Sequence, residues 1–489
     1  MRILYLILFI FISQVTAAQS FNGFMHSDFS GIIGAQLQPA NIAGSPYKYD
    51  FSLLNGNLFL TNNIAYSAPA ASGNSLFRYL ERDQKYLHAN IALGGFSGMV
   101  SLAGNESLGF TYRIRAHASG IDFSPDLLIQ FNRFSNPRFL NSQVTDQTGE
   151  FSTSLWREYA LTYAKIIKDD GYHRWKMGAS FKLINPRANA FVKVNDFGYT
   201  IDNNGVPEIT AAELEFGYSD NLNDFKQFDG VEPLNRLPSL TGNRIGFDLG
   251  LVYERVAFRE APKETNGTSY EPDIDYEFKL SASITDIGTM KHKYGSASAI
   301  ANGLLPTADL NNVDAIFDSL QSFRGFRDSL SQLSQVNPLS GEYTVSLPTT
   351  LNLGYDYSFG NHLFVGAHAR VDLTGLIPTN YRLNYLHSLT LTPRWERQKK
   401  GIYTPIYINQ LGDFHLGLAA RYGPITIGTQ SIGALLAKEQ KTSGFFFSIN
   451  INQLKANAKK PYCFGASRGT AMTNTKRTPI YKRKKWLFF

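Results

Sequence analysis

One stretch of the chain matches a catalytic motif. Residues 465–469 read G-A-S-R-G, the G-x-S-x-G pattern that presents a nucleophilic serine in α/β hydrolases. The motif works only between a strand and a helix, above an α/β sheet. Ser467 lies instead in a basic tail that contains glycine and threonine. We therefore expect no catalysis at this serine.

A serine–histidine pair is the second chemistry to consider, because a membrane barrel can carry such a pair on its lipid-facing surface as a phospholipase. Both side chains must then lie on the apolar face, within hydrogen-bond reach on neighbouring strands. Three histidines lie in strand-like runs, on the same side of the strand as Arg, Asp and Gly and not on the apolar side: His117, His368 and His415. The pattern predicts that they point away from lipid and that the protein is not an enzyme.

Metal and cofactor sites lack a sequence signal. The nine histidines are dispersed, and Cys463 is the only cysteine, so neither a ligand spacing nor a thiolate site is present. No glycine-rich loop follows a strand and opens a helix, so nucleotide binding has no support. We expect no metal and no cofactor.

The remaining chemistry is a set of charged side chains on the polar side of alternating segments. Unpaired charges away from water are costly, so these groups must be hydrated or paired across an interior. An open porin uses such groups to bias permeant ions, and a plugged barrel uses them as structural bridges; we favour pairing with a plug. The candidate lumen-lining residues are Arg113, Arg115, Arg244, Asp248, Glu254, Glu277, Lys279, Asp356, His368, Arg370, Asp372, Asp413, His415 and Arg421.

The elements that position these residues repeat with a period of two. In residues 353–373, two runs flank a Gly360-Asn361 turn, with one face apolar or aromatic and the other mixing Gly with Asp, His and Arg. Successive side chains of a strand leave opposite faces. In a soluble sandwich the polar face meets water, whereas in a membrane barrel the apolar face meets lipid and the polar face lines a lumen. The local pattern allows both.

The connections between strands decide between these two folds. About 16 alternating runs lie between residues 50 and 452. The long connections all fall at one end of the strands: 61–94, 118–154, 219–242 and 287–342. The tight connections all fall at the other end: 104–106, 168–172, 360–362 and 423–424. The exception is 257–272, a long connection at the end with the tight ones. This asymmetry is typical of outer-membrane barrels. Trp156, Trp175 and Trp395 lie at strand ends, where an interfacial aromatic girdle is expected.

The two ends of the chain differ from the barrel, which we place at residues 49–452. Residues 1–18 have the basic start, apolar run and small residues of a signal peptide, with cleavage before Gln19. No other stretch approaches about 18 uninterrupted apolar residues, so we expect no helical membrane span. Residues 19–48 show no alternation; they form either a plug in the lumen or a disordered leader.

Residues 287–342 form the longest insertion and contain one helical pattern. Ile316, Leu320, Phe323 and Leu330 recur at helical spacing, behind asparagine caps at 311 and 312. We expect a helix that caps the extracellular mouth by packing on its own loop; a helix that binds a partner is the alternative.

The C-terminal tail, 453–489, carries the basic charge. It contains 10 Lys or Arg and no Asp or Glu, so of the chain's 47 basic and 40 acidic residues the body keeps 37 and 40. After a last strand that runs downward, the tail starts in the periplasm. A basic run with terminal aromatics suits anionic lipid headgroups, cell-wall polymer or an acidic partner; a solvated extension is the alternative. We expect no nucleic acid in that compartment.

Two short motifs resemble a known family. Residues 38–43 (QPANIA), followed by YKYD at 47–50, and the strand ending SITDIG at 283–288 are similar to an uncharacterised Bacteroidota outer-membrane barrel family, a domain of unknown function. More distantly, the chain resembles barrels of the long-chain fatty-acid transporter type, which implies 14 strands and an N-terminal plug. Our count from the sequence is 16 strands, within an expected range of 12 to 16, whereas the resemblance implies 14. A hairpin outside the bilayer, formed by 190–200 and 209–218, reconciles the two counts. The family brings no catalytic residue or ligand.

The sequence therefore predicts an all-β protein, a single transmembrane antiparallel barrel of 14 strands with an N-terminal plug and one helical extracellular insertion. We expect it in the outer membrane after Sec-dependent export, in contact with outer-membrane lipid. Its predicted function is transport of hydrophobic or small solutes. An anchor or component of an envelope or secretion assembly is the alternative, and an outer-membrane lipid hydrolase is a remote one.

Overall fold

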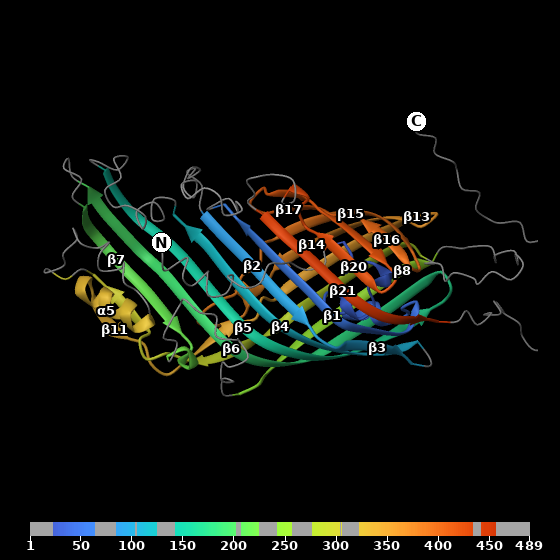
Figure 1. Cartoon of the computed structure of the whole chain (residues 1–489), viewed down its shortest axis with the longest axis horizontal. Helices are drawn as coiled ribbons and strands as arrows, with labels where there is room; N and C mark the ends of the chain where they lie inside the picture. Colours follow the sequence, from blue (N-terminus) through green and yellow to red (C-terminus); the bar gives the residue numbers. More distant parts are fainter. Residues whose placement is uncertain are drawn as a thin grey trace, which may run out of the picture. The chain divides into compact units, whose positions relative to one another are not determined.

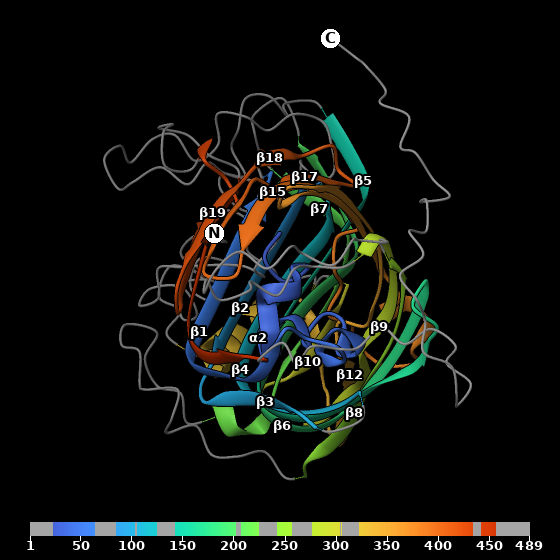
Figure 2. The same ribbon diagram turned by 90° about the vertical axis from the view of Figure 1, so that its right-hand side faces the viewer.

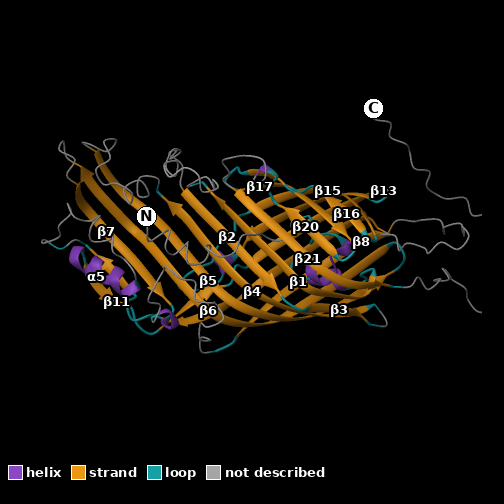
Figure 3. Ribbon diagram, viewed as in Figure 1, coloured by secondary structure: helices purple, strands orange, loops and turns teal. Residues whose placement is uncertain are grey.

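The computed structural model describes residues 23–63, 85–102, 105–124, 142–201, 207–223, 242–256, 276–303, 305, 322–433 and 442–455. Within these ranges, fourteen antiparallel strands close into a barrel, seen from the side in Figures 1 and 3. The predicted fold class and the preferred strand number are confirmed. The signal peptide and residues 456–489 of the basic tail lie outside the described residues and stay predictions, whereas residues 453 and 454 belong to β21.

The ring is closed by its first strand, which pairs with β2 on one side and with β21 on the other. Several ring positions are shared by two short strands in line. In chain order the ring contains β1 (Tyr47–Asn62), β2 (Lys85–Gly94) with β3 (Ser97–Ser101), β4 (Glu106–Phe123), β5 (Ser142–Asp169), β6 (His173–Ile201), β8 (Arg244–Val256), β9 (Tyr276–Lys293), β13 (Thr350–Gly360), β14 (Leu363–Asp372), β15 (Ser388–Arg397), β16 (Lys400–Tyr403) with β17 (Ile406–Asn409), β18 (Phe414–Leu416) with β19 (Leu418–Tyr422), β20 (Ile425–Thr429) and β21 (Thr442–Leu454).

The alternation of the sequence becomes an inside and an outside. Leu249 and Ile427 are 52% and 48% exposed on the outer face, while their neighbours Asp248 and Thr426 are 1% and 2% exposed and face the interior. This arrangement is the inverse of a soluble protein, whose apolar side chains are buried. An exposed apolar belt around a polar interior is the surface that a lipid bilayer requires.

The two ends of the barrel differ in their connections. We call the end where β21 starts and β1 ends the long-loop end, and the opposite end the short-turn end. At the short-turn end, β13 and β14 are joined by a tight turn in which Gly360 and Asn361 have φ of 78° and 51°. Glycine and asparagine tolerate this left-handed region better than other residues, so the predicted Gly360-Asn361 turn is confirmed.

A sheet extends the barrel wall at the long-loop end. β6 is 29 residues long; its first half pairs with β8 and its second half with β7 (Pro207–Tyr218). β7 then pairs with β10 (Ala299–Asn302), β10 pairs with β11 (Gln335–Pro338), and β12 (Glu342–Ser346) pairs with the end of β9. The predicted runs 190–200 and 209–218 are this second half of β6 and β7. They pair above the ring, which is why the ring has 14 strands and not 16.

The helix of the insertion is α5 (Phe323–Leu333), with Ser322 as its N-cap. Its aromatic side chains pack on the extended sheet: the Phe323 ring stacks on Tyr218 at 4.0 Å, and the Phe326 ring meets Phe216 at 4.8 Å. The helix thus packs on its own insertion. The predicted caps at 311 and 312, with Ile316 and Leu320, lie outside the described residues. Among the described residues no helix is long and apolar enough to cross a membrane.

Three expectations about local structure are wrong. Residues 85–94 and 142–154 belong to β2 and β5, although we assigned them to loops. The sequence also predicts one alternating run over 382–396, but residues 382–387 precede β15. The third concerns Trp156, which is fully buried rather than part of an interfacial girdle. Its indole N–H points to Glu158, and the Arg115 guanidinium lies 4.8 Å above its ring, so this side chain belongs to the interior.

Candidate functional site: the barrel interior

An N-terminal segment occupies the interior of the barrel. Residues 23–46, called here the luminal segment, contain three short helical turns, η1 (Asp28–Ser30), α2 (Gly31–Gly34) and η2 (Pro39–Ile42). Figure 2 shows α2 inside the ring of strands. Ile32, Ile33 and Ile42 are fully buried and pack with Ala164 and Phe446 of the wall. The apolar side of the luminal segment thus finds its partners inside the barrel.

Glycines in the wall make room for the backbone of the luminal segment. A Cβ atom on Gly178 of β6 would lie 2.6 Å from backbone atoms of Pro39 and Ala40. A Cβ atom on Gly250 of β8 would lie 1.8 Å from the side-chain oxygen of Gln38. Any other residue at these inward positions would collide with the segment. The wall and the segment are therefore complementary in shape.

Hydrogen bonds attach the luminal segment to the wall at one strand pair in particular. The Gln38 amide donates to the backbone carbonyls of Leu251 in β8 and Ala282 in β9, at 3.2 and 2.9 Å. The Ser283 hydroxyl donates to the carbonyl of Leu37 at 2.6 Å. These contacts are polar and individually modest, about 0.5–1.5 kcal/mol each. Apart from the peptide bond that joins Pro46 to β1, the segment is held by many weak bonds.

The first ion cluster joins β4, β5, β6, β8 and β9. Arg115 contacts Glu158 at 3.0 Å and Asp286 at 2.7 Å, and Lys182 contacts Asp248 and Asp286 at 2.7 and 2.6 Å. Arg113 also pairs with Glu158. The six side chains carry three charges of each sign and are at most 9% exposed. Because each charge has an opposite neighbour, the cluster keeps its charges in a site with little water.

The second ion cluster connects the luminal segment to the wall. Lys279 of β9 contacts Asp28 of the segment at 3.0 Å, and Tyr276 donates to both Asp28 and Asp356. Arg394 of β15 pairs with Asp356 and with Glu396 at 2.8 Å. In the same region, the Ser27 hydroxyl of the segment donates to Glu396. The contacts made by Asp28 and Ser27 must break before the segment can move.

The predicted lumen-lining residues divide into three groups. Those that the structure buries are Arg113, Arg115, Asp248, Glu254, Lys279, Asp356, His368 and Arg421; those that it leaves partly exposed are Arg244, Arg370, Asp372, Asp413 and His415. Glu277 is exposed and does not line the interior. The register between β8 and β9 shifts at Arg255 and Val256, opposite Phe278 and Tyr276, so Tyr276 points inward in place of Glu277.

Several interior residues were absent from our prediction. They are Glu158, Lys176, Lys182, Asp286, Arg394 and Glu396. Most share the inward phase of runs that the sequence already defined, and that phase was the available signal. Asp286 is different, because it has φ of 61° next to an irregular register of β8 and β9. Period-two alternation does not hold through such an irregularity.

The connection between β14 and β15, residues 373–387, folds into the long-loop end of the barrel. Leu383 is fully buried, and the carbonyl of Asn384 lies 3.0 Å from the ring nitrogen of His117. The Tyr385 hydroxyl accepts from Asn90 of β2 at 2.9 Å. The interior is therefore bounded by this connection on one side and by the luminal segment on the other.

A group of side chains between this connection and the luminal segment is called here the imidazole cluster. Its members are His26 of the luminal segment, His368 and Arg370 of β14, His88 of β2, His117 of β4, Tyr385, Tyr407 of β17, His415 of β18 and Phe59 of β1. His88, His117 and Tyr385 lie within 5.2 Å of one another, measured between ring centroids. The rings of His26 and His368 stack at 3.3 Å. Histidine and tyrosine can each donate or accept a hydrogen bond, so this region offers many polar contacts without an ion pair.

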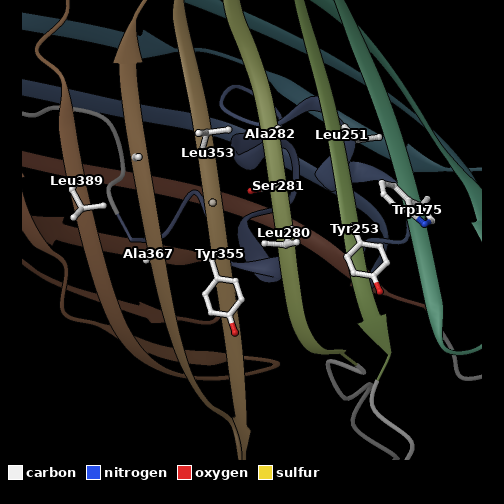
Figure 4. Close-up of a pocket in the computed structure, with 12 residues that line it drawn as sticks. Trp175, Leu251, Tyr253, Leu280, Ser281, Ala282, Leu353, Tyr355, Ala367 and Leu389 are labelled. Carbon is white, nitrogen blue, oxygen red and sulfur yellow. The ribbon is translucent and has the colours of Figure 1, made fainter.

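A hollow of about 620 Å³ lies on the outer face of β6, β8, β9, β13, β14 and β15. Figure 4 shows Trp175, Tyr253 and Tyr355 beside small residues such as Ala282 and Ala367. The strands beneath are fully paired, with Leu251 opposite Ala282 and Ala282 opposite Leu353. The hollow is therefore a groove on the apolar surface, directly outside the carbonyls that hold Gln38, and not a hole through the wall.

Comparison with known proteins gives one family and several distant structures. The sequence profile described as "Family of unknown function (DUF5723)" matches residues 39–430. A search of curated proteins gives no match. Among solved structures, a TodX deltaS2S3 mutant monoaromatic hydrocarbon channel aligns with a TM-score of 0.41 and 9% identity, over 86% of this chain and 94% of that one. A Pseudomonas aeruginosa FadL homologue aligns at 0.39 and 10%, over 89% and 98%. The P. putida toluene transporter TodX aligns at 0.38 and 10%, over 86% and 92%.

Proposed function

We propose that this chain, which belongs to the family of unknown function DUF5723, is an outer-membrane barrel that passes hydrophobic or small solutes. In this proposal the luminal segment is the gate. The family comes with no activity, so the proposal rests on the interior. One observation carries it: part of the lumen is occupied by a segment of chain that does not belong to the wall. A barrel of about eight strands is already filled by its own side chains, whereas more strands enclose additional space.

The way the luminal segment is held supports a gate. Its backbone fits against Gly178 and its Gln38 side chain against Gly250, and its polar groups contact Lys279, Glu396 and two wall carbonyls. All of these contacts are non-covalent, so displacement of the segment leaves the ring of strands intact. An anchor without transport has no need of 14 strands, because a narrower barrel also spans the membrane.

Removal of the gate is the direct test. We expect mature protein without residues 21–48, reconstituted in liposomes, to give faster swelling in a small neutral sugar than the full mature chain. Folding of each sample is checked by the heat-dependent shift in electrophoretic mobility that closed barrels show. Equal swelling of two folded samples would remove the gate from the proposal.

Point variants cover the case in which the deleted protein does not fold. Gln38→Ala and Ser283→Ala together remove three hydrogen bonds between the segment and the wall. We expect the double variant to fold and to swell faster than the parent. A matched control is Ser331→Ala in α5, whose hydroxyl contacts only its own helix.

One feature of the sequence favours a second function, an anchor in the cell envelope. The tail 453–489 holds 10 of the 47 basic residues and no acidic one, and it follows β21, which ends at the short-turn end. In the outer membrane this end faces the periplasm, where a basic tail can bind cell-wall polymer or an acidic partner. An anchor predicts a partner that co-purifies with the whole protein but not with a chain ending at residue 452, and no solute uptake.

A further inference from the structure

Arg370 has fewer polar partners than most cations of the interior. Arg421 also lacks a carboxylate partner in the described chain, but its guanidinium donates to backbone carbonyls. Within the described residues the Arg370 guanidinium makes one hydrogen bond, from Nε to the side-chain oxygen of Asn352 at 3.2 Å, and lies 5.3 Å from the centre of the Tyr385 ring. Arg113, Arg115, Lys182, Lys279 and Arg394 each contact at least one carboxylate. The two terminal nitrogens of Arg370 have no such partner in the described chain.

The carboxylates nearest to Arg370 along the interior are engaged elsewhere. Asp372, two residues further along β14, accepts from the backbone N–H groups of Thr374 and Tyr385. Asp413 accepts from the side chains of Tyr86 and Asn409. Within the described chain, neither carboxylate forms an ion pair with Arg370.

The surroundings of Arg370 are open to water and hold other unpaired polar atoms. Arg370, His26, Tyr385 and His415 are each only partly buried. In the same cluster the ring nitrogen Nε2 of His88, which is 3% exposed, has no hydrogen-bond partner in the described chain. Buried polar groups in proteins are normally hydrogen-bonded, so a group without a partner requires an explanation.

The rings of the imidazole cluster define the shape of what can bind there. Tyr385 lies under Arg370 and next to His88 and His117; Phe59 touches His88 and Tyr407. Planar rings favour a planar aromatic partner by stacking or edge contacts. A guanidinium fork matches the two oxygens of a carboxylate.

From this geometry we infer an anion-binding site at Arg370, between the luminal segment and residues 373–387, that takes the carboxylate of a small aromatic acid. The carboxylate pairs with the terminal nitrogens of Arg370, and the ring of the acid lies against the partly exposed ring of Tyr385. The inference rests on the proposed function for its role in uptake, since it names the class of solute. Binding itself is independent of transport.

The test is calorimetric titration of purified full-length mature protein in neutral detergent with benzoate. Benzyl alcohol has the same ring without the charge, and inorganic phosphate has the charge without the ring. We expect benzoate to bind at least about tenfold more tightly than either, because the site supplies both a charge-assisted hydrogen bond and a ring contact. Phosphate binding as tight as benzoate would overturn the aromatic part of the inference.

Arg370→Gln is the decisive variant, with Arg382→Gln as its control. Arg382 is an exposed arginine of the same inward-folded connection, so the control removes an equal charge outside the cluster. We expect Arg370→Gln to weaken benzoate binding at least about tenfold and Arg382→Gln to leave it unchanged. Arg370 makes a single hydrogen bond, so the variant is expected to fold, which the mobility shift verifies. Unchanged benzoate binding in folded Arg370→Gln protein would refute the site. Swelling in a neutral sugar reports on the gate separately, so failure of one proposal does not imply failure of the other.

Discussion

On the arc of the barrel from β4 to β9, the buried cations Arg113, Arg115, Lys176, Lys182 and Lys279 all contact carboxylates. On the arc from β14 through β17 to β2, Arg394 is also paired with carboxylates, but Arg370 has none within the described chain, and the rings near it are imidazoles and phenols. The two arcs line one interior and come from the same alternating sequence pattern. They differ at Arg370, a cation that has no carboxylate partner within the described chain.

This difference separates structural from binding roles. A buried charge with full partners has little left to offer a ligand, and its loss leaves other charges uncompensated. A charge without a partner adds little to folding but can pair with a solute. We therefore expect substitutions on the first arc to change stability and those on the second to change binding.

Lys182→Met should give the largest effect on the first arc. Lys182 contacts Glu158, Asp248 and Asp286, and it is 1% exposed. Its removal leaves three carboxylates with only two arginines as partners. Removing one partner of a buried ion pair lowers the free energy of unfolding by about 3–5 kcal/mol. The measurement is the free energy of unfolding in urea, in lipid vesicles, followed by intrinsic fluorescence.

A matched control removes a lysine from an ion pair at the surface. Lys165 contacts Glu106 at 2.7 Å, with the two side chains 46% and 31% exposed. Lys165→Met is expected to change stability very little, because exposed pairs contribute little in water. If the two lysine variants were equally stable, the first arc would not be the structural one.

Gly178→Val should give the second largest effect, and it addresses the gate. The new side chain would meet the backbone of Pro39 and Ala40, so either the wall or the luminal segment must shift. Overpacking of this kind costs about 1–3 kcal/mol. We expect the segment to yield, which should appear as faster swelling and as new protease cleavage within residues 23–46 of a folded barrel.

The control for this variant is Gly375→Val, where the nearest atom to a new Cβ is a terminal nitrogen of Arg382 at 3.9 Å. It should leave swelling and cleavage unchanged. A Gly178→Val protein that swells like the parent, with residues 23–46 still protected, would mean that the wall and not the segment yields.

The sequence predicted the wall of the barrel well because each strand carries its own evidence. Asp356 and His368 lie on the inside, as their alternation with apolar residues indicates. Alternation fails where the register is irregular: Glu277 lies next to such a shift in β8 and β9 and is exposed. A bulge has no reliable sequence signal, because it depends on how two strands pair.

The contacts across the lumen could not be predicted from the sequence, for a different reason. Arg115 and Asp286 are 171 residues apart and pair only because the ring brings β4 opposite β9. The interior position of Trp156 has the same cause. From the sequence alone, an aromatic residue near a strand end fits the interior and an interfacial girdle equally well, and only the fold shows that Arg115 lies above its ring. The sequence identified the inward charges but not which of them would be left without a partner.

The smallest effects test the comparison at the level of single hydroxyl groups. Thr162 of β5 exchanges a hydrogen bond with Ser180 of β6 at 2.8 Å, on the first arc. Thr392 of β15 is fully buried on the second arc, and its hydroxyl has no partner in the described chain. Replacing either threonine by valine keeps the shape of the side chain.

Thr162→Val should cost about 1 kcal/mol of unfolding free energy, because it leaves the Ser180 hydroxyl without its partner. Thr392→Val should cost nothing or add stability, since it removes a polar atom that already lacks one. Both values come from the same urea titrations as the lysine variants. An equal cost at the two positions would mean that an ordered water satisfies Thr392. In that case Thr392 would be bonded as fully as Thr162, and the two arcs would not differ at these hydroxyl groups.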